Sequence, residues 1–208
     1  MSRTPPPRPT FWARVAALLL DYGIILGWMA ILAAATLALS AITGGFFNWL
    51  SLGTAGAQAL GFLLLVLPVG IYLYASEASS RQATVGKRVL RLKVVEASTG
   101  GRPSRSRILV RTVVKLLPWE IAHFAVWNIV ALVAAEDEAF PVWLLVVLVA
   151  ANVLPVVYIA MVAAQRQRRG PHDLVAGTRV EPVERGSAAL VLGEERETPS
   201  RSADAGLG

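Results

Sequence analysis

Two ionisable side chains lie in a stretch of sequence that is otherwise apolar. Arg14 and Asp21 are near the start of a long hydrophobic run, seven residues or almost two helical turns apart. In an α-helix they would share a face and differ in depth by about 10 Å. An ionised group at membrane depth costs several kcal/mol unless it is paired or hydrated. Each residue is therefore a candidate functional group that needs a partner of its own.

Further polar residues lie in two later apolar runs. Glu120 and His123 are spaced i, i+3 in "PWEIAHFAVWN", the spacing with which one helix can offer two ligands to a metal. A single pair of this kind falls short of a metal site, so we expect no bound metal and no cofactor. We predict instead that Glu120 pairs with a cation. Asp21, Glu120, His123 and Asn152 are the candidate residues of a polar, proton-binding site within the membrane.

The sequence lacks the residue sets that commonly perform catalysis. It contains no cysteine, which excludes disulfides, thiolate metal sites and thiol nucleophiles. It also shows no Ser/His/Asp set, no glycine-rich phosphate-binding loop and no paired catalytic carboxylates. We therefore expect a protein that is not an enzyme.

The apolar runs that hold these residues are long enough to be membrane spans. The chain of 208 residues is 55% hydrophobic and 16% charged, whereas soluble domains carry about a quarter charged residues. Four runs, at residues 15–42, 55–75, 116–135 and 140–164, reach the length of about 20 residues that a spanning helix needs. The first run is too long for the apolar core of a secretory signal. The sequence predicts an all-α integral membrane protein with four transmembrane helices.

The charges between the runs predict the orientation. Lys and Arg are concentrated before the first run, between the second and third, and after the fourth. The link between the first two runs is uncharged, and the link between the last two contains the acidic "EDE". Because cytoplasmic loops hold the excess of Lys and Arg, we expect a multi-pass protein of the cell (inner) membrane with both termini cytoplasmic. The high pI of 10.3 then indicates contact with anionic lipid headgroups rather than nucleic acid.

The long middle loop predicts two cytoplasmic elements. "KRVLRLKVV", residues 87–95, alternates apolar and basic side chains as a strand does, and we expect it to pair with "TRVEPV", residues 178–183, in a short two-stranded β element. Residues 104–117 predict an amphipathic helix capped by Ser104 or Ser106. Pro118 favours a separate helix lying along the headgroups over a continuation of the third span. Its basic positions are Arg107, Arg111 and Lys115.

These expectations divide the chain into three parts. Residues 1–10 are a cytoplasmic N-terminal segment, residues 11–183 form the membrane domain, and residues 184–208 are rich in small, polar and charged residues and predicted to be disordered.

The order of these motifs resembles the RDD family of membrane proteins, which is named for one arginine and two aspartates. The resemblance covers about residues 10–182 and includes "TVGKRVLRLKVVEASTGGRPS" and "HDLVAGTRV", while "KLLPWEIAH" is similar to a bacterial, actinobacterial-type subgroup. Pro171 departs from the pattern and fixes φ just before the second aspartate. The residues that match the family motifs are Arg14, Asp21, Gly86, Lys87, Arg111, His172 and Asp173.

The resemblance implies two alternative functions, since some family members are implicated in cation/proton antiport or other transport and others in membrane-protein assemblies. Transport would use the intramembrane polar site. Because we find no internal repeat in the sequence, it would require a homo-oligomer. A scaffold would bind anionic lipid and a partner membrane protein. In either case we predict an ion pair between Arg14 and Asp173, with Lys87 as a competing partner and Asp21 in a deeper polar pocket.

Overall fold

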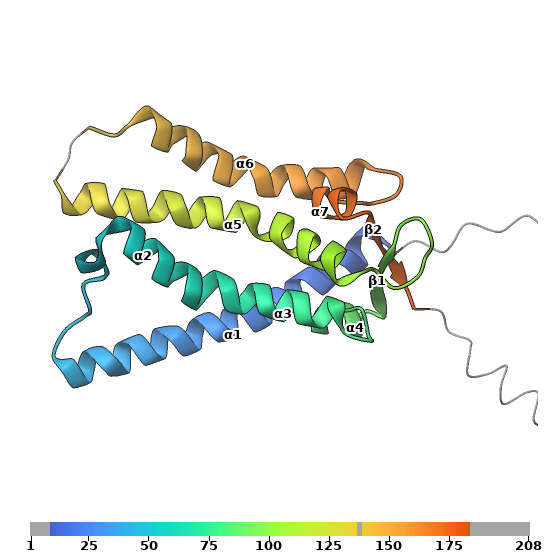
Figure 1. Cartoon of the computed structure of the whole chain (residues 1–208), viewed down its shortest axis with the longest axis horizontal. Coiled ribbons are helices and arrows are strands. Elements are labelled where there is room, and N and C mark those ends of the chain that lie inside the picture. Colours follow the sequence, from blue (N-terminus) through green and yellow to red (C-terminus); the bar gives the residue numbers. More distant parts are fainter. Residues whose placement is uncertain (1–8, 137–138, 184–208) are drawn as a thin grey trace, which may run out of the picture.

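The computed structural model describes residues 9–136 and 139–183, which form a bundle of long helices with a small layer of short elements at one end (Figure 1). Each of the four long helical segments is long and apolar enough to cross a membrane. The chain is therefore a multi-pass membrane protein, as predicted. The segments are α1 (Phe11–Thr43), a second span made of η1 (Trp49–Leu52), α2 (Gly53–Gly61), η2 (Phe62–Val66) and α3 (Leu67–Ala78), then α5 (Arg105–Ala134) and α6 (Val142–Ala164).

The end layer contains two short helices, each followed by a strand. These are α4 (Val85–Val89) with β1 (Leu92–Glu96), and α7 (Pro171–Val175) with β2 (Thr178–Pro182). The strands pair antiparallel with Val94 opposite Val180, so the predicted β element is confirmed. It is shorter than predicted, because residues 87–89 belong to α4 and Arg91 takes a positive φ of 53° before the strand begins.

The end layer reveals a structural repeat that the sequence did not show. Both short helices have five residues, and each begins seven residues before its strand. The register places the equivalent residues Val94 and Val180 opposite each other, and the flanking hydrogen bonds, Ala97 N to Gly177 O and Val183 N to Arg91 O, are equivalent as well. The short helix and strand that follow each pair of spans are thus related by a local twofold at the sheet. The spans pack differently in the two halves, since α6 packs along α5 whereas α1 has few contacts with α2 and α3. We find no repeat in the sequence itself, because only the spacing and secondary structure of the end layer reveal this one.

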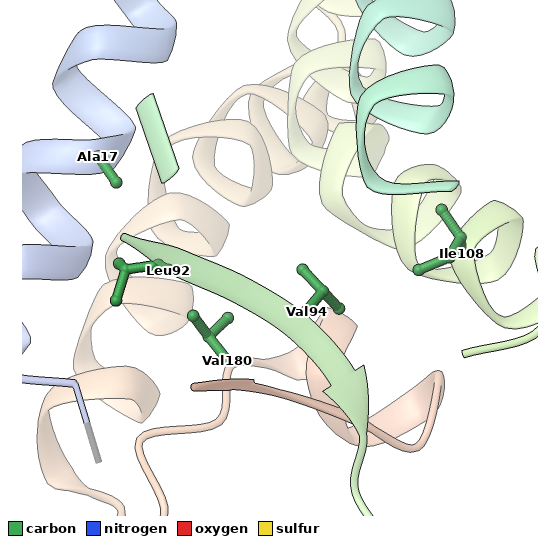
Figure 2. Packing of buried hydrophobic residues seen from close by; sticks show 5 residues of the cluster. All are labelled: Ala17, Leu92, Val94, Ile108 and Val180. Atoms are coloured by element: carbon green, nitrogen blue, oxygen red, sulfur yellow. The ribbon is translucent and has the colours of Figure 1, made fainter. Parts of the chain in front are cut away.

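A buried apolar cluster attaches the sheet to the bundle. Leu92 and Val94 of β1 and Val180 of β2 lie between Ala17 of α1 and Ile108 of α5 (Figure 2). The first span of each half therefore packs against the same sheet, which fixes the polar side chains of both helices relative to the end layer.

The separate surface helix predicted for residues 104–117 is wrong. Ser104 caps α5, and the helix continues through Pro118 into the third span. A proline leaves the carbonyl four residues earlier without its helical donor, and here the hydroxyl of Tyr158 on α6 donates to Val114 O at 2.8 Å. The neighbouring helix thus satisfies the carbonyl, so Pro118 need not end the helix.

The second span contains a similar arrangement. Pro68 cannot donate to Leu64 O, which lies in the π-helical turn η2, and the indole of Trp28 on α1 donates to this carbonyl at 2.9 Å. Residues 1–8, Asp137 and Glu138 of the acidic link, and the tail predicted to be disordered lie outside the described residues.

Candidate functional site

Glu77 binds three cationic side chains at the end of α3. It is 1% exposed, and it is held by helices of both halves of the repeat. Its Oε1 accepts from Lys87 Nζ of α4 and from Lys115 Nζ of α5, both at 2.9 Å, and its Oε2 accepts from Arg111 Nε of α5 at 2.8 Å. A carboxylate buried to this degree is retained only with such partners.

Asp173 binds two arginines in the same region. Arg14 Nη2 lies 2.8 Å from its Oδ2, and Arg111 Nη1 donates to its Oδ1. Gly170 N and Thr178 Oγ1 donate to the same carboxylate at 3.2 Å each. Burial acts to raise the pKa of Asp173, but the charge of Arg111, with a smaller effect of Arg14, holds it well below its ordinary value.

The predicted ion pair between Arg14 and Asp173 is therefore present in the structure, but the predicted competitor is not. Lys87 contacts Glu77 instead, and Arg111 is the second cation on Asp173. The prediction that Arg111 and Lys115 lie along headgroups is likewise wrong, because both side chains point to buried carboxylates.

Asp21 is bound by neutral donors. Tyr72 Oη, Thr84 Oγ1 and the backbone N of Gly86 donate to it at 2.8, 2.6 and 2.9 Å. Gly86 is required here, because a Cβ at this position would overlap the backbone oxygen of Ala17 on α1. In the described part of the chain Asp21 thus anchors the start of α4 to α1 by hydrogen bonds and has no ion-pair partner.

One hydrogen-bonded chain joins these groups. Thr84 Oγ1 donates to Asp21 and accepts from Lys87 Nζ at 3.1 Å, which connects Asp21 to the cations on Glu77. We call this set the ion-pair network; its members are Arg14, Asp21, Glu77, Thr84, Lys87, Arg111, Lys115 and Asp173. The links from Arg14 to Asp173 and from Glu77 to Arg111 and Lys115 join the two halves of the repeat.

His172 lies beside the network, with Nε2 3.5 Å from Asp173 Oδ2. Burial, followed by the positive charge of Arg111, lowers the pKa of His172 well below its ordinary value, so the imidazole is neutral at pH 7. Its Nδ1 is buried and has no hydrogen-bond partner among residues 9–136 and 139–183.

The structure does not bring together the four residues of the predicted proton-binding site. Glu120 accepts from the side-chain amide of Gln58 at 2.8 Å rather than pairing with a cation. His123 accepts from Trp119 at 3.0 Å, and Asn152 is exposed and donates to a carbonyl of its own helix. These three residues and Asp21 therefore occupy separate polar contacts.

A cavity of about 440 Å³ lies between the two halves, against the network. Its walls come from α1 and α3 of the first half and from α5 and α6 of the second. The Arg, Lys, Asp and His residues that line it are Arg14, Asp21, Lys87, Arg111, Lys115 and His172, and most of the remaining lining residues are apolar.

Sequence reasoning missed Glu77, Tyr72 and Thr84. Glu77 closes the second apolar run in "YASEAS" and precedes a loop dense in cations, without another Asp or Glu until Glu96. A single acidic residue between a span and so many Lys and Arg was the available signal for an ion-pair partner. Tyr72 and Thr84 carried no comparable signal.

The comparisons with known proteins agree with the motif order. A sequence model of the RDD family matches residues 8–177, which is most of the chain. No curated protein sequence matches the chain significantly. The family match and the four apolar helices together establish that this chain is a multi-pass membrane protein of the RDD family.

Proposed function

We propose that the protein is a membrane transport protein for an anionic ligand and that the cavity is its binding site. The observation that carries this proposal is the charge of the network, which contains four Lys or Arg side chains against three carboxylates. Excess positive charge in a low-dielectric site is stabilised by an anion, and Arg and Lys are the side chains that bind phosphate and carboxylate.

The repeat supports transport over a purely structural role. Transporters are commonly built from two related halves with the substrate site at their interface, and the cavity here lies between the halves. The proposal assigns no catalytic step to the chain.

Cation/proton exchange is the alternative form of transport, and the geometry favours it less. The three donors on Asp21 satisfy this carboxylate within the protein, and the surplus of Lys and Arg repels a cation from the cavity. The proposal also keeps the orientation expected from the charges, with the end layer in the cytoplasm of the cell and the acidic link outside.

The test uses vesicles of zwitterionic lipid that contain the purified protein, with protein-free vesicles as reference. One assay measures uptake of radiolabelled inorganic phosphate, and a second measures movement of acyl-labelled fluorescent phosphatidylglycerol between leaflets by reduction with dithionite. A third adds Na⁺ or K⁺ outside vesicles that contain a pH dye. We expect protein-dependent movement of at least one anion, reduced in Lys115→Gln.

The other outcomes contradict the proposal in different ways. A pH change driven by Na⁺ or K⁺, without movement of either anion, would assign the protein to cation/proton exchange. No protein-dependent signal in any assay would favour the scaffold, which binds lipid and partner proteins without moving a ligand.

A further inference from the structure

The cavity changes character along the helices. Its cationic lining comes from the ends of the helices next to the end layer, where Arg14 and Arg111 lie. Ile25 on α1 and Ala122 on α5 line it eleven residues further into each span, about 16 Å along the helix axis. This is about half of the ~30 Å hydrocarbon thickness. The cavity therefore fits a ligand with an anionic end and an apolar chain that reaches into one leaflet.

The cavity also opens toward the surface that faces lipid. Leu18 and Tyr22 of α1 and Ile159 of α6 line it and are 45%, 45% and 54% exposed. Helix α1 has its most extensive contacts with α4, whereas α5 and α6 pack along each other. A ligand in the bilayer can therefore reach the cavity between α1 and α6 without leaving the membrane.

The cations differ in how accessible they are. The side chain of Arg111 is 1% exposed and already binds two carboxylates and the hydroxyl of Thr178. Lys115 is 19% exposed and Arg14 is 12% exposed, and each has one carboxylate partner. Lys115 shares its acceptor, Oε1 of Glu77, with Lys87. Lys115 is thus the cation best able to donate to an additional anionic group.

We propose that the ligand of this cavity is an anionic phospholipid that enters laterally between α1 and α6. Its phosphate binds Lys115 and Arg14 near the end layer, and an acyl chain lies along Ile25, Leu116 and Trp119. The inference rests on the proposed function and specifies its ligand. A free anion such as inorganic phosphate would use the same cations but not the apolar walls.

The experiment places the protein in nanodiscs of phosphatidylcholine and adds a lipid with brominated acyl chains, which quench nearby tryptophans. The signal of Trp119 is the difference between the wild-type protein and Trp119→Phe at each lipid composition. Taking this difference excludes from the signal the quenching of the other five tryptophans. The added lipid is either brominated phosphatidylglycerol, which is anionic, or brominated phosphatidylcholine with the same chains.

We expect half-maximal quenching of Trp119 at a mole fraction about tenfold lower for the anionic lipid, the difference that one charge-assisted hydrogen bond to the headgroup produces. Lys115→Gln should abolish the preference, while Lys115→Arg should retain it. Arg105→Gln is the matched control, since Arg105 is on the same helix but exposed and outside the cavity lining. Ala122→Phe fills the apolar part and should reduce quenching by both lipids with every charge in place.

Equal quenching by the two lipids would overturn the lipid assignment. Equilibrium dialysis of radiolabelled inorganic phosphate then separates the two proposals. Phosphate binding that Lys115→Gln weakens would keep the anion site and remove only the lipid. If neither lipid preference nor phosphate binding is found, the proposed function fails too.

Discussion

Replacing Glu77 by Gln should destabilise the protein more than any other removal of a single carboxylate near the end layer. The substitution preserves size but removes the charge that Lys87, Lys115 and Arg111 share at 2.8–2.9 Å. Arg111 would keep Asp173, whereas both lysines would lose their carboxylate partner. Removing one member of a buried ion pair costs about 3–5 kcal/mol. This is a large part of the roughly 5–15 kcal/mol by which a folded protein is stable.

Glu96→Gln is the matched control for this prediction. Glu96 pairs with Arg107 at 3.1 Å, but the two side chains are 23% and 44% exposed, so the loss should stay below about 1 kcal/mol. The measurement is the free energy of unfolding in mixed micelles titrated with sodium dodecyl sulfate. Lys115→Gln, added to Glu77→Gln, should recover part of the loss because it removes one of the two unpaired ammonium groups. Equal losses for Glu77→Gln and Glu96→Gln would refute the buried network as a source of stability.

Three further predictions concern the other polar groups. Combining Arg14→Asp with Asp173→Arg exchanges the charges of this ion pair. The exchange should not restore the folded fraction measured by size-exclusion chromatography, because the new arginine would face the guanidinium of Arg111, which also binds Asp173. Recovery would show that the pair acts alone. Thermal stability should fall as the pH drops from about 7 to below about 6.5, since the lowered pKa of His172 lets only the unfolded chain take up that proton. His172→Phe should reduce this fall in stability, and an unchanged profile would contradict the prediction. Gly86→Ala should cost about 1–3 kcal/mol by forcing α4 away from α1, whereas Gly27→Ala, with open space around it, should not.

The sequence predicted the elements of this fold better than their polar contacts. Long apolar runs and alternating strands depend on local composition, so four spans and the pairing of residues 92–96 with 178–182 could be anticipated. The basic periodicity at Arg107, Arg111 and Lys115 has two physical solutions. The cations can face phosphate at the surface, or they can face buried carboxylates from other helices. The positions of Glu77 and Asp173 distinguish these solutions, and they depend on contacts between distant parts of the chain.

The placement of Asp21 shows the same limit. Spacing correctly predicted that Arg14 and Asp21 would use different partners. The deeper pocket expected for Asp21 was wrong, because this carboxylate binds Thr84 and Gly86 at the start of α4. Spacing could not identify Tyr72, Thr84 or the backbone of Gly86 as the donors.

We grouped Asp21 with Glu120 because both are carboxylates within apolar runs. Their donors differ, since Gln58 of α2 binds Glu120 whereas the donors to Asp21 lie on α3 and at the start of α4. An uncharged donor is common in any sequence, so composition gives little indication of where it will be used.

The repeat explains why an arginine and an aspartate stand two turns apart at the start of the first span. Asp21 binds the start of α4, the short helix of its own half, while Arg14 reaches Asp173 on α7, the equivalent short helix of the other half. Lys87 and Asp173 occupy equivalent positions in α4 and α7 and carry opposite charges. Lys87 pairs within its own half, and Asp173 also pairs across the interface. The two charges on α1 therefore connect this helix to the short helices of both halves at the cationic end of the cavity, where the proposed anionic ligand would bind.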